Sequence, residues 1–237
     1  MLNLDYTLTP TDVPLRRRVG ITPAPLKEVQ TICRQYHYSH KAWGMAQLPY
    51  WVTLDGEAVG VLLMGSPRLG RNFRMHPPMS LLRVCRFWVH SPADRATYTG
   101  SDGRVHTLWV RACALAQAMR RCRQDWARRF PVFQPIECVV AWADDEHDEV
   151  ELYRALNFTE IPVEDRDMNW HMPNRPRPPH AFWYEFDVPL SELQLYRIRQ
   201  EGLRELYNTR YGDSHSVDQA RAAKIADSLS AYSRYFV

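Results

Sequence analysis

The sequence predicts an α/β (α+β) domain in which a mixed central sheet is flanked by helices. Two observations carry this prediction. Asp55-Gly56 lies between two apolar runs, which is a strong signal for a two-residue β-hairpin. Further along the chain, two more apolar runs are separated by a long amphipathic helical pattern. That order predicts a strand–helix–strand crossover, and therefore a parallel pair of strands in the same sheet.

The first part of the chain supplies one strand, one helix and the hairpin. Prolines limit the first two dozen residues to a short strand around Arg18–Thr22. Pro25 then opens a helical pattern whose apolar face reaches Tyr36. The hairpin strands are expected at Tyr50–Leu54 and Ala58–Met64.

The middle of the chain carries the first strand and the helix of the crossover. Leu81–His90 (LLRVCRFWVH) is predicted as a strand, and Ser91–Gly103 as a loop. The strongest helical pattern begins at Val105 and continues at three-and-four spacing to Cys122. One face of the strand is expected to carry Leu82, Val84, Arg86 and Trp88.

The remaining elements complete the sheet and add a helical tail. Ile136–Ala143 is predicted as a buried strand, Glu149–Leu156 as a short helix and Ala181–Val188 as a last strand. Ser191–Tyr207 and Ser216–Ser230 both show helical patterns, and each opens with a serine followed three residues later by glutamine, a capping-box pair.

The length of 237 residues favours one large domain. We expect a catalytic domain over residues 1–189 and a C-terminal helical extension over residues 190–237. The extension could form a homodimer interface, a DNA-binding tail or a cover for the sheet.

The composition is that of an ordinary globular protein, with 45% hydrophobic and 24% charged residues. No apolar run reaches the length of a membrane span, and the N-terminal sequence has no stretch typical of a signal peptide. The five cysteines are scattered without paired metal spacing, which fits free thiols in a reducing compartment. We therefore expect a cytoplasmic protein with no membrane partner.

The net charge of +3 says little about partners, but arginine is heavily favoured over lysine. Guanidinium groups suit phosphate and carboxylate binding better than ammonium groups do. Such clusters fit nucleic acid or a cofactor phosphate, and solvated surface charge is the alternative. The clusters are Arg16–Arg18, Arg68–Arg74, Arg120–Arg129 and Arg175–Arg177.

The order of elements resembles that of the GNAT acyltransferases, in which the pantetheine arm of the cofactor lies between two splayed parallel strands. Here Leu81–His90 and Ile136–Ala143 would be those strands. The sequence LYRALNF at residues 152–158 is similar to the family's Tyr-x-x-x-Gly-Phe ending, with asparagine in place of glycine. The resemblance implies acyl-CoA (acetyl-CoA) as the donor and Val89 among the cofactor-binding residues. Arg86 is predicted as a further cofactor contact, because an arginine on a mostly buried strand needs a partner, and either a phosphate or an ion pair with Asp144 would supply one.

The loop before the long helix departs from the family. GNAT enzymes carry a Gln/Arg-x-x-Gly-x-Gly/Ala loop there, whose backbone amides hold the cofactor pyrophosphate at the helix N-terminus. This chain has Thr99–Arg104 (TGSDGR) instead. Its glycines and the expected helix start allow anion binding, so Gly100, Gly103 and Arg104 are predicted cofactor contacts. The different spacing weighs against acyl-CoA.

The Mom-like phage proteins, which modify adenine in duplex DNA, share this departure, and residues 20–190 resemble them in four short features. The resemblance implies a transferase that adds an acyl-derived group to an exocyclic base amine, with N6 of adenine in double-stranded DNA as the expected acceptor. Such a modification protects phage or plasmid DNA from restriction. The features are His37-Tyr38-Ser39, the turn Met64–Pro67, Arg86, and the series Trp142–Asp144, His147 and Tyr153, without the branch's glycine beside the histidine.

Four residues are predicted to be catalytic. Asp144 follows a buried strand, at the strand end where ligands of α/β folds commonly bind, and would accept the proton of the attacking amine. Tyr153 would protonate the leaving group, and His37 and Tyr38 lie in a polar turn after the first helix. Structural alternatives stay open: Asp144 as a helix N-cap, Tyr153 as a core aromatic, and His37 as a helix cap or packing residue.

A metal site is a further hypothesis. His37, Asp144 and His147, with Tyr38 nearby, would form a nitrogen–oxygen ligand set suited to iron or zinc if the fold brings them together.

Two kinds of side chain are predicted to contact DNA. Trp43 and Trp170 lie in polar loops beside arginines and could stack on a base extruded from the duplex. Arg71, Arg175 and Arg177 are predicted to contact phosphates, the last two within the loop Asp165–His180.

Two other functions stay open. A GNAT acyltransferase acting on a small amine or a protein would bind acyl-CoA tightly and be indifferent to DNA. In a non-catalytic GNAT-shaped binding module, replacing Asp144 or Tyr38 by alanine would alter only stability.

Overall fold

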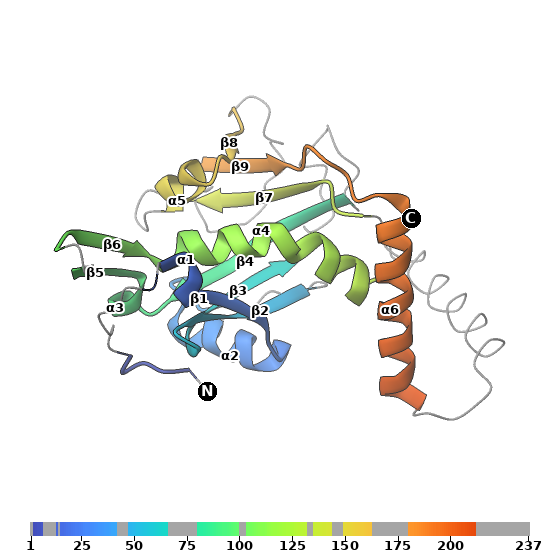
Figure 1. Ribbon diagram of the computed structural model, residues 1–237, viewed down its shortest axis with the longest axis horizontal. Coiled ribbons are helices and arrows are strands. Elements are labelled where there is room, and N and C mark those ends of the chain that lie inside the picture. Colours follow the sequence, from blue (N-terminus) through green and yellow to red (C-terminus); the bar gives the residue numbers. More distant parts are fainter. Residues whose placement is uncertain are drawn as a thin grey trace. The chain divides into compact units, whose positions relative to one another are not determined.

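The computed structural model describes residues 2–6, 13, 15–41, 47–65, 80–99, 103–131, 135–143, 149–162 and 180–211 (Figure 1). In chain order its elements are α1 (Leu15–Arg18), β1 (Val19–Pro23), α2 (Leu26–Tyr36), β2 (Gln47–Leu54), β3 (Glu57–Gly65), β4 (Leu81–Val89), α3 (Ser91–Asp94), β5 (Arg95–Thr99), β6 (Val105–Trp109), α4 (Val110–Arg129), β7 (Cys138–Ala143), α5 (Glu149–Ala155), β8 (Thr159–Glu160), β9 (His180–Glu185) and α6 (Glu192–Tyr211).

The described strands form a seven-stranded sheet in the order β1-β2-β3-β4-β7-β9-β8 and a two-stranded sheet, β5-β6. In the large sheet β4 and β7 are parallel and the other neighbours are antiparallel. The predicted mixed central sheet with helices packed on it is therefore confirmed.

The chain divides into two compact units. The first comprises residues 1–123 and 136–189 and contains both sheets, and the second comprises residues 124–135 and 190–237. Within the part of the chain that the structure describes, no helix combines the length and apolarity needed to cross a membrane.

The predicted hairpin is present as β2 and β3. Asp55 and Gly56 have φ angles of 52° and 88°, the left-handed conformation that a tight hairpin turn requires. Arg18 stabilises the turn, because its Nε and Nη2 donate to the two carboxylate oxygens of Asp55 at 2.8 and 2.5 Å. The Tyr6 hydroxyl donates to the same carboxylate at 2.5 Å. The hydrogen bonds from Arg18 hold the pKa of Asp55 below its usual value.

A β-bulge in β4 decides which face of the sheet its side chains occupy. The register with β3 shifts between Leu63 and Met64, and Cys85 is the inserted residue. Arg83 and Arg86 consequently lie on the same face, although they are three positions apart. Strict alternation does not survive such an insertion. The prediction of one face carrying Leu82, Val84, Arg86 and Trp88 is therefore wrong.

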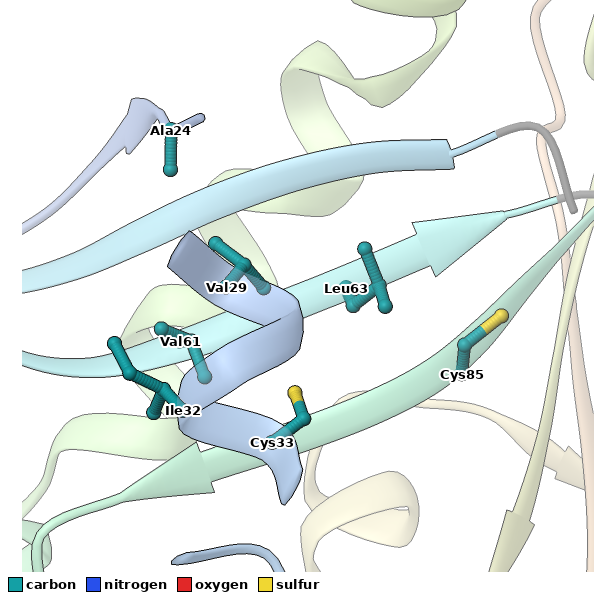
Figure 2. Packing of buried hydrophobic residues seen from close by; sticks show 7 residues of the cluster. All are labelled: Ala24, Val29, Ile32, Cys33, Val61, Leu63 and Cys85. Carbon is teal, nitrogen blue, oxygen red and sulfur yellow. The ribbon is translucent and has the colours of Figure 1, made fainter. Parts of the chain in front are cut away.

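Helices α2 and α4 cover opposite faces of the sheet. Helix α2 packs on Val61 and Leu63 of β3 (Figure 2). On the other face, the Arg121 guanidinium of α4 lies 5.8 Å from the ring centroid of Tyr50, which pairs with Leu62. The cluster under α2 consists of Ala24, Val29, Ile32, Cys33, Val61, Leu63 and Cys85.

The segment Val105–Trp109 forms β6 rather than the first turns of a helix, so the predicted helix start is wrong. It pairs with β5, which together with α3 replaces the expected loop Ser91–Gly103. The apolar spacing of the segment fits a helix, but its β-branched and aromatic residues also favour a strand, and the partner strand decides between them. Gly103 and Arg104 therefore precede the strand β6 in the chain and not the start of α4.

The other predicted elements are present with ends shifted by a few residues; α1 and β8 are additional. Ser191 begins α6 as predicted, because Gln194 N–H donates to Ser191 Oγ at 3.3 Å and Ser191 N–H donates to Gln194 Oε1 at 3.1 Å. The predicted helix Ser216–Ser230 lies outside the described residues.

In the second unit, α6 approaches the end of α4 closely. A Cβ on Gly202 would lie 1.8 Å from the Arg128 carbonyl oxygen, so only glycine permits the approach. Arg128 Nη2 and Glu201 form an ion pair at 2.7 Å. Trp126 is buried, and its ring centroid lies 4.5 Å from that of Phe130.

Candidate active site

The parallel strands β4 and β7 stay together for only three residues. Residues 81–83 pair with residues 138–140, and among the described residues no further pair joins the two strands, although they continue to Val89 and Ala143 (Figure 1). This is the splayed pair that the resemblance to GNAT domains implies. Beyond the fork, the facing edges are not hydrogen-bonded to each other, so they can pair with an extended amide-containing molecule.

Tyr153 of α5 lies over the diverging end of β7. Its ring centroid is 5.4 Å from that of Phe182, which pairs with Ala141 of β7. The residue is 2% exposed, and burial, followed by Glu149, raises its pKa well above the ordinary value. Tyr153 is therefore protonated at neutral pH and can donate a proton, but it cannot act as a base.

Groups from both faces of the sheet lie near Tyr153. Arg83 lies on the face covered by α2, and Tyr38 follows the end of that helix and is 47% exposed, whereas Tyr153 lies on the other face and Arg111 belongs to α4. All are close enough to act on the pKa of Tyr153: Glu149 and Tyr38 raise it, and Arg83 and Arg111 lower it. Beside the fork between β4 and β7, groups from both faces of the sheet therefore influence the pKa of one residue, Tyr153.

His37 and Tyr38 lie together at the end of α2, with ring centroids 4.3 Å apart. His37 is buried, and the backbone N–H of Ser39 donates to its Nδ1 at 3.1 Å. Because Nδ1 accepts this bond, a neutral His37 carries its proton on Nε2 and presents a donor there. His37 is also the C-cap residue of α2, because its backbone N–H donates to the Cys33 carbonyl at 3.3 Å, and the Nδ1 of His40 lies 3.0 Å from the Arg34 carbonyl oxygen.

The two arginines of β4 have different surroundings. Arg86, a predicted cofactor contact, donates from Nε to the Lys41 carbonyl at 2.9 Å and so holds the chain after α2. Arg83, which the sequence did not single out, lies 5.9 Å from the ring centroid of Trp142, and burial lowers its pKa. The missed signal is that a buried strand carries two arginines. Val89, the other predicted contact on β4, is buried at its end.

Glu149 is a buried carboxylate that the sequence did not single out. It is the first residue of α5, is 6% exposed, and lies one helical turn before Tyr153. A glutamate in a first helical turn is ordinarily explained by the helix dipole. Burial next to a phenol makes Glu149 a second candidate for the base, beside Asp144.

The turn after α5 has the backbone that the resemblance to GNAT domains implies. Asn157 has a φ of 60°, in the left-handed region that favours glycine and that asparagine tolerates. Phe158 N–H donates to the Tyr153 carbonyl at 3.0 Å and closes the helix. Asparagine therefore serves at the position where the family has glycine.

Asp94 occupies the N-terminus of α4, where an anion would otherwise bind. Arg111 donates to it twice, from its backbone N–H to Oδ1 at 3.1 Å and from Nε to Oδ2 at 2.6 Å. Burial raises the pKa of Asp94, and Arg111 opposes that shift. The carboxylate of Asp94 therefore lies at the start of α4, where the diphosphate of an acyl-CoA would be expected, so the residues at this helix start do not match that part of the cofactor.

Other predicted site residues are placed elsewhere or lie outside the described residues. Gly103 and Arg104 are exposed at the β5–β6 hairpin, which removes the helix start on which their cofactor role was predicted. No three His, Cys, Asp or Glu side chains in the described ranges are grouped so as to hold a metal ion. Outside the described residues lie Asp144, His147, Gly100, Trp43, Arg71, Trp170, Arg175 and Arg177.

No protein-family model matches the sequence, and no curated protein matches it. Similar solved structures include RimJ of Mycobacterium smegmatis in complex with CoA-disulfide (16% identity, 78% of this chain and 89% of that chain covered, TM-score 0.43). Others are RimL, the ribosomal L7/L12 α-N-protein acetyltransferase, in complex with coenzyme A (12%, 73% and 97%, TM-score 0.44), and the ribosomal-protein-S18-alanine N-acetyltransferase of Escherichia coli (11%, 73% and 96%, TM-score 0.38). At these identities and TM-scores the likeness concerns the overall fold alone and carries no argument about activity.

Proposed function

We propose that this chain is a GNAT-like transferase of acyl-derived groups whose reaction takes place at the fork between β4 and β7. The observation that carries the proposal is the placement of a protonated, buried Tyr153 and a buried Glu149 beside strands that separate after three residue pairs. Strand edges at the fork would bind the extended arm of a donor, and Tyr153 would lie near its reactive end.

The chemistry follows from the protonation states. The nitrogen of an amine attacks the carbonyl carbon of the donor, an N–C bond forms, and the bond from that carbon to the leaving group breaks. The amine gives up a proton to a carboxylate, and Tyr153 gives one to the leaving group. The raised pKa of Tyr153 means that the phenol is protonated when the donor binds, so it can donate a hydrogen bond to the leaving group as negative charge develops there. Asp144 or Glu149 would be the carboxylate.

The acceptor that we propose is an exocyclic amine of a DNA base, N6 of adenine in duplex DNA. Support comes from the resemblance of His37-Tyr38-Ser39 and Tyr153 to the Mom-like branch. The preference for arginine agrees with it, since only three of the 30 basic residues are lysine.

The arginine cluster at residues 120–129 is expected to contribute less to DNA binding than its sequence indicates. Arg121 Nη1 donates to the Ile21 carbonyl at 3.2 Å, and Arg123 Nη1 donates to the Val188 carbonyl at 2.7 Å. These guanidinium groups fasten α4 to neighbouring backbone. The arginines that we propose as phosphate contacts are therefore Arg71, Arg175 and Arg177, which lie outside this helix.

The test is to express the full chain in a bacterial host, digest total DNA to nucleosides and search for a new mass. The wild type should give a new nucleoside. Tyr153→Phe should reduce it by about 10²- to 10⁴-fold, because loss of a general acid has that effect. Tyr184→Phe is the matched control, since this ring packs 5.4 Å from Phe158, which also contacts Tyr153, and its loss should leave the yield unchanged.

Equal yields from the Tyr153→Phe variant and the wild type would contradict the assignment of Tyr153. No new nucleoside from folded protein in two unrelated hosts would contradict DNA as the acceptor. The acceptor would then be a small amine or a protein, which radiolabelled acyl donors would reveal in the same cells, and no labelled product at all would indicate a non-catalytic binding module.

A further inference from the structure

The N-terminus of α4 is neutralised by a carboxylate from the chain itself. Asp94 and Arg111 are 17 positions apart, and their side chains are 10% and 15% exposed. Each oxygen of Asp94 accepts a hydrogen bond from Arg111, one from the backbone and one from the guanidinium group. The free backbone N–H groups of a helix start, together with its dipole, favour an anion at this place.

A second guanidinium group adds to the positive charge. Arg95 follows Asp94 directly and also lowers its pKa, and its guanidinium carbon lies 4.9 Å from the ring centroid of Trp109. A helix start flanked by two arginines is an arrangement that binds phosphate groups in many proteins. In this chain, the carboxylate of Asp94 takes the position that a phosphate oxygen would need.

We propose that Asp94 is a specificity-determining residue that excludes diphosphate groups from the start of α4. A diphosphate within hydrogen-bond distance of the Arg111 N–H would lie beside the carboxylate, and two anions at one site repel each other. The donor is therefore a thioester whose carrier offers an amide arm of the pantetheine type to the β4–β7 fork and no diphosphate to α4. This second part rests on the proposed function, whereas the exclusion of diphosphate does not.

Titration calorimetry on the full chain tests the exclusion with three probes: coenzyme A, pantetheine and inorganic pyrophosphate. The wild type should not bind pyrophosphate, and its Kd values for coenzyme A and pantetheine should agree within about threefold, since the diphosphate adds no favourable contact. Asp94→Ala should bind pyrophosphate and should bind coenzyme A about tenfold more tightly than pantetheine, the size of a favourable helix-terminus contact.

Two further variants keep the test decisive. Asp94→Asn removes the charge but retains an acceptor oxygen for the Arg111 N–H, so it should fold even if the alanine variant does not, and it should also gain pyrophosphate binding. Asp55→Asn removes the charge of another arginine-bound carboxylate, at the β2–β3 turn, and should behave as the wild type.

Wild-type protein that binds coenzyme A tenfold or more above pantetheine would overturn the proposal. So would folded Asp94 variants that fail to bind pyrophosphate. If the wild type binds neither coenzyme A nor pantetheine, the donor site at the fork is refuted, while the pyrophosphate measurements still decide the role of Asp94.

Discussion

Two carboxylate–arginine pairs in the first unit have almost the same contact distance, but the pKa values of their carboxyl groups are shifted in opposite directions. The closest contacts are 2.5 Å in Arg18–Asp55 and 2.6 Å in Asp94–Arg111. The pKa of Asp55 is lowered, chiefly by the hydrogen bonds from Arg18, whereas the pKa of Asp94 is raised, chiefly by burial. The Asp55 side chain is 34% exposed and that of Asp94 only 10%.

The different solvent exposure of the two carboxylates explains the opposite shifts. At a turn, water still solvates the carboxylate, so the arginine stabilises the charged form and the pair supports the fold. In the interior, the loss of hydration outweighs the arginine, so a hydrophobic or neutral group would serve stability as well. A charged pair that contributes little to stability, at a place where ligands bind, is a candidate for a functional role.

The largest stability effect is expected at the turn. Asp55→Ala leaves the buried guanidinium of Arg18 without its carboxylate, and we expect the free energy of unfolding to fall by about 2 kcal/mol, the scale for a lost charged hydrogen bond. Urea unfolding measures the change. A loss below about 0.5 kcal/mol would show that the pair is no more than an ordinary surface ion pair.

Asp94→Asn should have a smaller effect on stability, about 0 to 1 kcal/mol, because the neutral amide still accepts from the Arg111 N–H and loses less on burial than a carboxylate. The two positions should also depend on pH in opposite directions. Asp55 has a lowered pKa in the folded state, so its contribution is present above the unfolded pKa and is lost as pH falls through the folded pKa.

For Asp94 the sign is reversed, because its pKa is raised in the folded state. Its contribution is present below the unfolded pKa and is lost as pH rises through the folded pKa. Urea unfolding between about pH 3 and 7 should therefore show two opposite trends as pH rises. The free energy of unfolding of the wild type should fall relative to that of Asp94→Asn and should rise relative to that of Asp55→Asn. The same trend with pH for both variants would contradict the distinction between the two pairs.

Much of the fold could be predicted because its signals are local. The hairpin depends on Asp55-Gly56, and the start of α6 depends on Ser191 and Gln194, pairs that are close in sequence. The parallel pair β4–β7 followed from the long helical pattern between two apolar runs, since such crossovers join parallel strands.

What the sequence did not reveal depends on partners that are distant in the chain. The strand β6 exists because β5 pairs with it, and its residues alone also fit a helix. The bulge at Cys85 follows from pairing with β3 and moves Arg86 to the same face as Arg83.

The same limit applies to the candidate site. Glu149 and Asp94 are ordinary acidic residues in sequence, and only burial and the contact with Arg111 distinguish them. Tyr38 and Tyr153 were predicted from short motifs, and the structure brings them close enough to interact electrostatically.

The most direct test of the central claim, a reaction site at the β4–β7 fork, is photoaffinity labelling with a pantetheine amide that carries a diazirine in place of the acyl group. Peptide mass spectrometry should locate the label on residues 84–89, on residues 141–143 or on α5, and excess unlabelled pantetheine should suppress it. Label confined to the β5–β6 hairpin or to the second unit, or label that excess pantetheine does not suppress, would contradict a donor site at the fork.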